Sequence, residues 1–75
     1  MKAKDLTDTQ LKEFVDSIIK WHGTGILDNN EFRKTSEERY PASVDAIRMF
    51  ESDILIEAAQ RFSKMIGQKP SKLWL

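Results

Sequence analysis

The 75-residue sequence contains no cysteine, one histidine, two prolines and three glycines. Without cysteine there can be no disulfide bond, no zinc site with thiolate ligands and no thiol nucleophile. The single histidine, His22, leaves no further nitrogen ligand for a metal site and only one candidate base for a serine nucleophile. We therefore expect a protein that is not an enzyme and that carries no metal and no cofactor.

Long hydrophobic runs and an excess of one charge are also missing. The longest aliphatic run, Ile54-Leu55-Ile56, is far shorter than the roughly 18 residues that suggest a membrane span. The first residues, Met1 to Asp5, lack the apolar core of a secretory signal, so we expect a cytoplasmic protein. Because 12 Lys and Arg balance 12 Asp and Glu, the net charge does not point to a polyanionic partner.

A first helix is predicted over residues 8–22. Thr7 and Gln10 fit a capping box, in which each side chain binds the backbone N–H of the other residue. Gly23 is the predicted end, because glycine readily takes the left-handed conformation that follows a helix. One face of this helix repeats with a 3.6-residue period and ends on His22, to which we assign a structural role at the helix end. The residues of this face are Leu11, Phe14, Val15, Ile18 and His22.

A second, weaker helix is predicted over residues 29–38. Asp28 is expected to cap its N-terminus. After Phe32 there is no large apolar residue before Tyr40, so this helix has little surface to bury and should be short. Pro41 cannot continue a helix and therefore marks a boundary.

A third helix is predicted over residues 42–66, ended by Gly67 and Pro70. At about 100° per residue, its apolar side chains fall in one broad sector and are expected to form the core. They are Val44, Ile47, Phe50, Ile54, Leu55, Ala58, Ala59, Phe62, Met65 and Ile66. Residues 67–75 are either a tail or the start of a short fourth helix.

These elements predict an all-α protein. We expect a single helical domain over residues 1–75, built as a small three-helix bundle with or without the short fourth helix. The third helix is long for such a domain, because ~24 residues span ~36 Å, whereas a compact chain of this length has a diameter of roughly 30 Å. We expect either a kink in this helix or a second chain that covers its excess apolar surface.

Four residues of the third helix are candidates for contact with a partner. Met49 and Ile56 lie one heptad apart on the far side of the helix, which suits a helix–helix contact, although isolated exposed apolar residues are common. Arg48 and Glu51 lie near the apolar sector. They either pair with each other at i, i+3 or face a partner.

The C-terminal residues Leu73 and Trp74 have two interpretations. They either fold back to close the end of the bundle or form a terminal docking motif anchored by the tryptophan. The leading hypothesis is a small adaptor, inhibitor or regulatory protein. It would bind through helix–helix contacts, as a homodimer or docked on a larger protein.

Charge is segregated along the chain although its sum is zero. From Ala58 onward there is no acid, and the helix dipole favours basic residues at the end of a helix. The alternative hypothesis is that this basic segment binds nucleic acid. Its candidate contact residues are Arg61, Lys64, Lys69 and Lys72.

Overall fold

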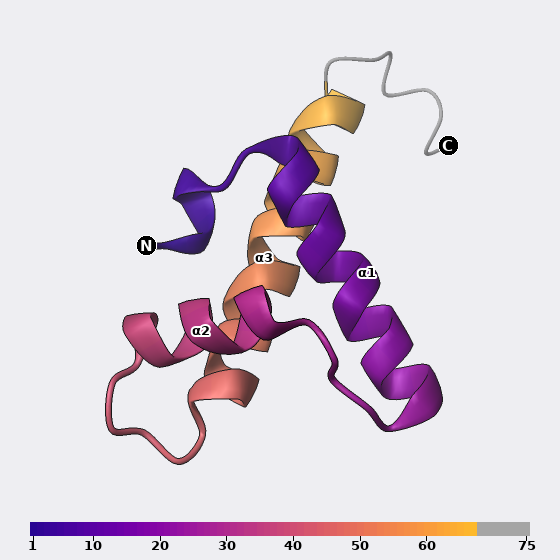
Figure 1. The fold of residues 1–75 in the computed structure, drawn as a ribbon. Helices are drawn as coiled ribbons and strands as arrows, with labels where there is room; N and C mark the ends of the chain where they lie inside the picture. The colour runs from indigo at the N-terminus through magenta and orange to yellow at the C-terminus, as the bar shows by residue number, and fades with distance from the viewer. Residues whose placement is uncertain (68–75) are drawn as a thin grey trace.

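The computed structural model describes residues 1–67, which form one short 3-10 helix and three α-helices without any strand. The elements are η1 (Ala3–Asp5), α1 (Asp8–Thr24), α2 (Asn30–Arg39) and α3 (Ala46–Gly67). α1 and α3 run in opposite directions, and α2 crosses α3 (Figure 1). The predicted all-α, three-helix architecture is confirmed. The expected fourth helix falls in residues 68–75, outside the described part of the chain.

The core is built around three phenylalanines, one from each α-helix. The ring of Phe32 lies 5.3 Å from those of Phe14 and Phe50, and the latter two lie 5.9 Å apart, all three pairs edge to face. Phe32 and Phe50 are fully buried and Phe14 is nearly so. Each edge-to-face pair adds about 0.5–1.5 kcal/mol to the burial of the rings. This cluster therefore holds the three helices against one another.

α1 begins where the sequence predicts but ends later. The amide of Gln10 donates to the Thr7 hydroxyl over 3.1 Å and the amide of Thr7 donates to the Gln10 side chain over 2.9 Å, which completes the capping box. The predicted end before Gly23 is wrong, because the helix continues to Thr24. The residue that takes the left-handed conformation is Gly25, with a φ of 78°.

The start of α2 differs from the prediction in the identity of its cap. The side chain of Asn29, and not that of Asp28, accepts a hydrogen bond from the backbone amide of Phe32 over 3.1 Å. The Asp28 carboxylate instead binds Lys20 of α1 over 2.6 Å, and the hydrogen bond from this ammonium lowers the pKa of Asp28. The loop between α1 and α2 is thus held by an ion pair to α1 as well as by the cap.

α2 buries more than its single phenylalanine. Thr35 and Ser36 lie one turn after Phe32 on the same face and are both buried. Their hydroxyls donate to backbone carbonyls of the same helix over 2.8 Å and 2.7 Å, so these buried donors are satisfied. Beyond the helix, the Tyr40 hydroxyl donates to Asp53 of α3, and this hydrogen bond raises the pKa of Tyr40. Two small buried residues and the hydrogen bond from Tyr40 to Asp53 therefore hold α2 against the rest of the protein, although its sequence is mostly polar.

α3 begins at Ala46, later than the predicted residue 42. A turn from Tyr40 to Ser43 is closed by the Ser43 amide, which donates to the Tyr40 carbonyl over 3.3 Å. Within this turn Ala42 has a φ of 62°, in the left-handed region that a right-handed helix does not allow. Val44 follows the turn before the helix begins, and it is fully exposed instead of in the core as predicted.

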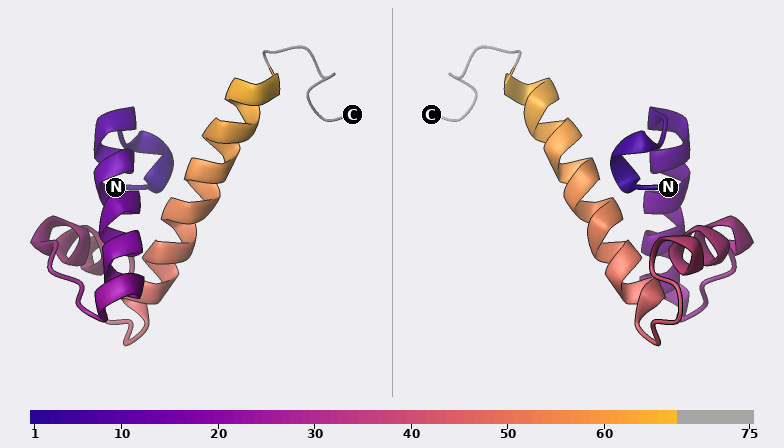
Figure 2. Two further views of the ribbon diagram at one scale, coloured as in Figure 1. Left: turned by 90° about the vertical axis from the view of Figure 1, so that its right-hand side faces the viewer. Right: turned by 90° about the vertical axis from the view of Figure 1, so that its left-hand side faces the viewer.

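α3 is one continuous helix, but only its first half is buried. Its buried residues are Ala46, Phe50 and Ile54. The C-terminal half leans away from α1 (Figure 2), and the radius of gyration is 14.1 Å, against about 11 Å for a compact chain of this length. The placement of Leu55, Ala59, Phe62 and Met65 in the core is therefore wrong, because all four are exposed.

The different burial of two phenylalanines in α3 gives a direct test. We expect Phe50→Ala to lower the free energy of unfolding by about 3–5 kcal/mol, because it opens a cavity at the centre of the core. Phe62→Ala, the same change at an exposed position, should cost less than about 1 kcal/mol. Urea unfolding followed by circular dichroism at low protein concentration measures both values. Equal losses would contradict this placement of α3.

Candidate interaction surface

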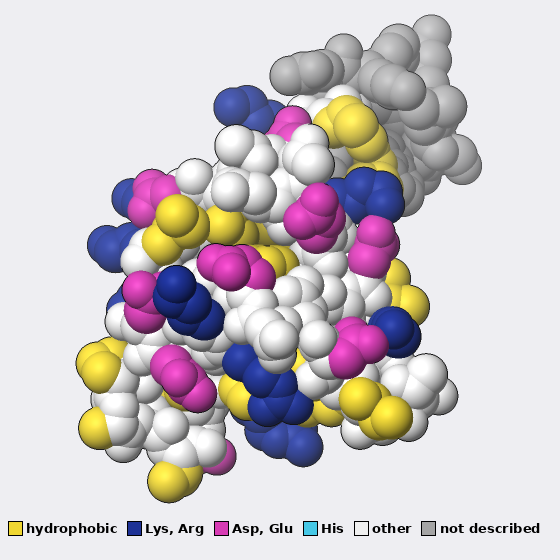
Figure 3. Space-filling model, in the orientation of Figure 1, with side chains coloured by type: hydrophobic (Ala, Val, Ile, Leu, Met, Phe, Trp, Pro, Cys, Tyr) yellow, Lys and Arg dark blue, Asp and Glu magenta, His cyan; other side chains and the backbone are white. Residues whose placement is uncertain are grey.

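One side of α3 exposes a group of apolar residues that we call the free face. It consists of Leu55, Ile56, Ala59, Phe62 and Ile66. Leu55, Ile56 and Phe62 are 44%, 54% and 56% exposed, while Ala59 is exposed and Ile66 is partly buried. Hydrophobic side chains also reach the surface over the C-terminal end of α3 in the view of Figure 3. The C-terminal half of α3 therefore presents apolar side chains outside the core.

Most of the free face points away from the rest of the protein. Relative to Phe50 in the core, Phe62 lies about 120° and Ala59 about 180° around the helix axis. α1, α2 and η1 lie on the core side of α3 (Figure 2). Ile56 is the member of the face nearest to them, because it lines a shallow hollow with Lys2, Ala3 and Arg39. In addition, α1 begins at Asp8, which is level with Arg61 because the two form an ion pair at 2.7 Å. The last turns of α3 consequently extend beyond α1.

Four residues of the free face follow the spacing of a helix–helix seam. Leu55, Ala59, Phe62 and Ile66 recur at intervals of four, three and four residues, which is the a/d pattern of a coiled coil. α3 is thus apolar on its core side and on its outer side. An apolar stripe on a helix normally packs against another element, yet nothing in residues 1–67 covers the outer stripe of α3.

The two apolar contact residues predicted from the sequence lie at or beside this surface. Ile56 belongs to the free face, and Met49 is exposed at its edge, where its sulfur accepts a 3.6 Å hydrogen bond from the Ser43 hydroxyl. Sequence reasoning misses the centre of the surface, Leu55 and Phe62, because it assigns both to the core. The sequence does contain one signal for this surface, because the apolar sector of α3 is wider than two neighbouring helices can cover.

Arg48 and Glu51 are engaged within the protein. The guanidinium of Arg48 lies 5.9 Å from the centre of the Trp21 ring, and the Glu51 side chain, 12% exposed, pairs with His22. An ion pair between Arg48 and Glu51 is not found among the described ion pairs. His22, which lies near the end of α1, binds α3 through Glu51. These contacts tie the end of α1 to the start of α3.

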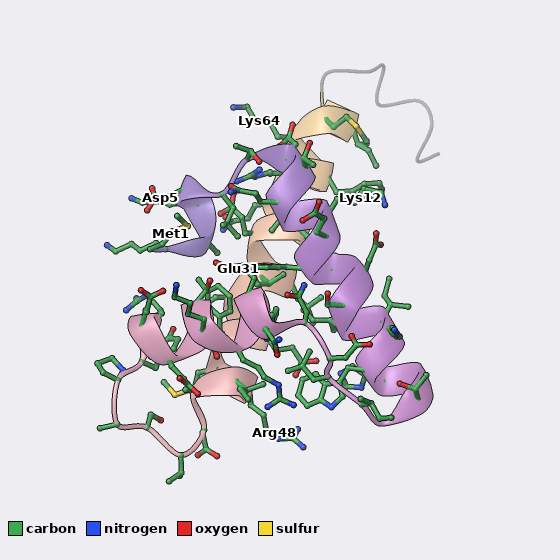
Figure 4. The ribbon with its side chains drawn as sticks, in the orientation of Figure 1. Met1, Asp5, Lys12, Glu31, Arg48 and Lys64 are labelled. Carbon is green, nitrogen blue, oxygen red and sulfur yellow. The ribbon has the colours of Figure 1, made fainter. Side chains whose placement is uncertain are left out.

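Arg61 ties the N-terminal segment to α3. Its guanidinium donates to Glu57 over 2.8 Å, to Asp8 over 2.7 Å and to the backbone carbonyl of Leu6 over 2.7 Å. The hydrogen bonds to the two carboxylates raise the pKa of Arg61. Its charge is therefore balanced within the protein. Lys64, in contrast, is exposed and extends into solvent at the opposite end of α3 from Arg48 (Figure 4).

The remaining predicted contact residues lie in residues 68–75, outside the described part of the chain. They are Lys69, Lys72, Leu73 and Trp74. Their assignments to a docking motif, to closure of the bundle or to nucleic-acid contact stay predictions.

Residues 1–67 contain neither a metal-binding cluster nor a membrane-spanning helix. No three His, Asp or Glu side chains in this range are grouped to hold a metal ion, and none of its helices combines the length and apolarity needed to cross a bilayer. A surface hollow of about 520 Å³ is lined in part by Asp8, Glu57 and Arg61, which already pair with one another. These three charged groups of the hollow thus already have partners within the protein.

In comparisons with known proteins, no family model, no curated protein and no solved structure matches this chain.

The network around Arg61 predicts different effects for two basic residues of α3. Arg61→Ala should lower the free energy of unfolding measurably, because it removes the hydrogen bonds to Glu57, Asp8 and the Leu6 carbonyl. Lys64→Ala, at an exposed position, should change it by less than about 0.5 kcal/mol. Chemical unfolding monitored by circular dichroism checks this. Two equally small effects would show that the network does not hold the N-terminal segment.

Proposed function

We propose that this protein is a non-enzymatic binding module, in the manner of an adaptor, inhibitor or regulatory protein, that docks on another protein chain through the free face. The observation that supports this most is the exposure of Leu55, Ile56 and Phe62 on the side of α3 opposite the core. Contiguous apolar patches on the surface of a small domain mark interaction sites. A helix suits the partner best, because side chains of a second helix pack into a seam of this spacing.

Phe62 is the proposed anchor of the contact. Aromatic side chains contribute much of the binding energy when they become desolvated at the centre of an interface. Leu55 and Ile66 lie two turns before and one turn after Phe62 and would shield its ring from water. The exposed Ser52 and Ser63 beside them form a polar rim, as is usual around an apolar interface centre.

Nucleic-acid binding is a second proposal with less support. Arg61, one of its four basic residues, is paired with Asp8 and Glu57, and carboxylates at this place oppose a phosphate backbone. Lys64 alone neutralises little of such a backbone. An electrophoretic mobility shift at low salt would test this proposal, and the absence of any shift would remove it.

A photo-crosslinking amino acid at position 62 tests the main proposal. p-Benzoylphenylalanine keeps the phenyl ring of Phe62 and adds a photoreactive benzoyl group to it. The same amino acid at Val44 is the matched control, because Val44 is exposed outside the free face. On irradiation in extract of the native host, we expect covalent adducts with a protein chain from position 62 and none from position 44.

Competition makes this test specific. An excess of the wild-type chain should suppress the adducts, whereas an excess of Phe62→Glu should not, because a charge in the seam prevents its burial. Equal adducts from both positions, or none from either, would contradict the proposed function.

A further inference from the structure

We infer that the partner of the free face is a second copy of this chain, with the two α3 helices packed antiparallel. The inference rests on the proposed function, since it names the chain that covers the face. Three features of α3 support it. They are the order of large and small residues along the seam, the direction of the helix dipole and the position of the face relative to the core.

The side chains of the seam are complementary to those of a second copy when the second helix runs in the opposite direction. In an antiparallel pair centred on the middle of the seam, Leu55 lies opposite Ile66 of the second copy, and Ala59 lies opposite Phe62 of the second copy. The two-fold axis repeats both contacts. Each Phe62 ring then meets a small alanine that leaves room for it, and an aliphatic pair closes each end. Large and small residues alternate across the contact, as close packing requires.

A parallel pair uses the same residues less well. In register, it would place Phe62 against Phe62 in one layer and Ala59 against Ala59 in the next. The first layer would be crowded and the second would leave a gap, and each defect lowers stability.

The helix dipoles also favour the antiparallel direction. In an antiparallel pair the dipoles of the two α3 helices oppose each other, whereas in a parallel pair they align. Arg61 and Glu57 are paired within each copy, so they add no free charge to the contact.

The position of the face permits this pairing without rearrangement. Since α1, α2 and η1 lie on the core side of α3 (Figure 2), none of them obstructs a helix on the outer side. The seam from Leu55 to Ile66 is only ~18 Å long, whereas a standard interface buries about 800 Å² on each partner. We therefore expect a dimer with a dissociation constant in the micromolar range.

Sedimentation equilibrium of the full chain, from low to high micromolar concentration, tests self-association. The wild-type chain should change from monomer to dimer. Phe62→Glu should weaken the dimer at least about 100-fold, because it buries charge in the seam. Val44→Glu, which introduces the same charge outside the free face, should leave the dimer unchanged. Ala59→Phe adds no charge but overfills the seam, and it should weaken the dimer about tenfold.

Cysteine crosslinking tests the direction of the helices. Because the chain has no cysteine, the variants Leu55→Cys and Ile66→Cys each carry a single thiol. When the two variants are mixed and oxidised, the antiparallel pair predicts disulfides that join position 55 of one copy to position 66 of the other. Each variant oxidised alone should give little crosslinked product.

Several results would overturn the inference. A chain that stays monomeric at the highest concentration would exclude a second copy as the partner of the free face. A dimer that Phe62→Glu does not weaken would place self-association elsewhere, and crosslinks from 55 to 55 or from 66 to 66 would contradict the antiparallel direction. If photo-crosslinks from position 62 to a different protein persist in these cases, the proposed function stands without this inference. Their absence would remove both.

Discussion

The packing of Phe14, Phe32 and Phe50 is the constraint on which the rest of the structure depends. Each α-helix contributes one ring, and each ring meets the other two edge to face. Because Phe50 lies near the start of α3, the cluster supports only the first half of this helix. The second half is held through hydrogen bonds from Arg61 to the N-terminal segment and to the start of α1. These hydrogen bonds fix the direction of α3 relative to α1, but they involve only the core side of the helix.

This uneven support leaves α3 with two apolar sides. Ile54 is fully buried, while its sequence neighbours Leu55 and Ile56 are about half exposed on the outer side. The residues that stabilise the fold are thus distinct from those of the free face. A substitution on the outer side leaves the core contacts in place, whereas a substitution in the phenylalanine cluster acts on the fold itself. The proposed binding function requires this separation.

Local signals in the sequence predict the helices better than their packing. The capping box at Thr7 and the break at Pro41 involve residues close in sequence, and both are found. The end of α1 is less predictable, since Gly23 and Gly25 suit a left-handed position equally well. The side of α3 that meets the core depends on where the rings of the other helices lie, and a broad apolar sector does not reveal this. For that reason most of the free face is assigned to the core from the sequence, and only Ile56 is placed outside it.

Methyl NMR over a concentration series tests the central claim most directly, namely that another copy of the chain buries the free face in solution. The methyl resonances of Leu55, Ile56 and Ile66 should move progressively as the protein concentration rises. Those of Ile54, in the core, and Ile26, exposed in the loop after α1, should stay in place. If no resonance of the free face moves up to the highest concentration, or if only Ile26 moves, the account is contradicted.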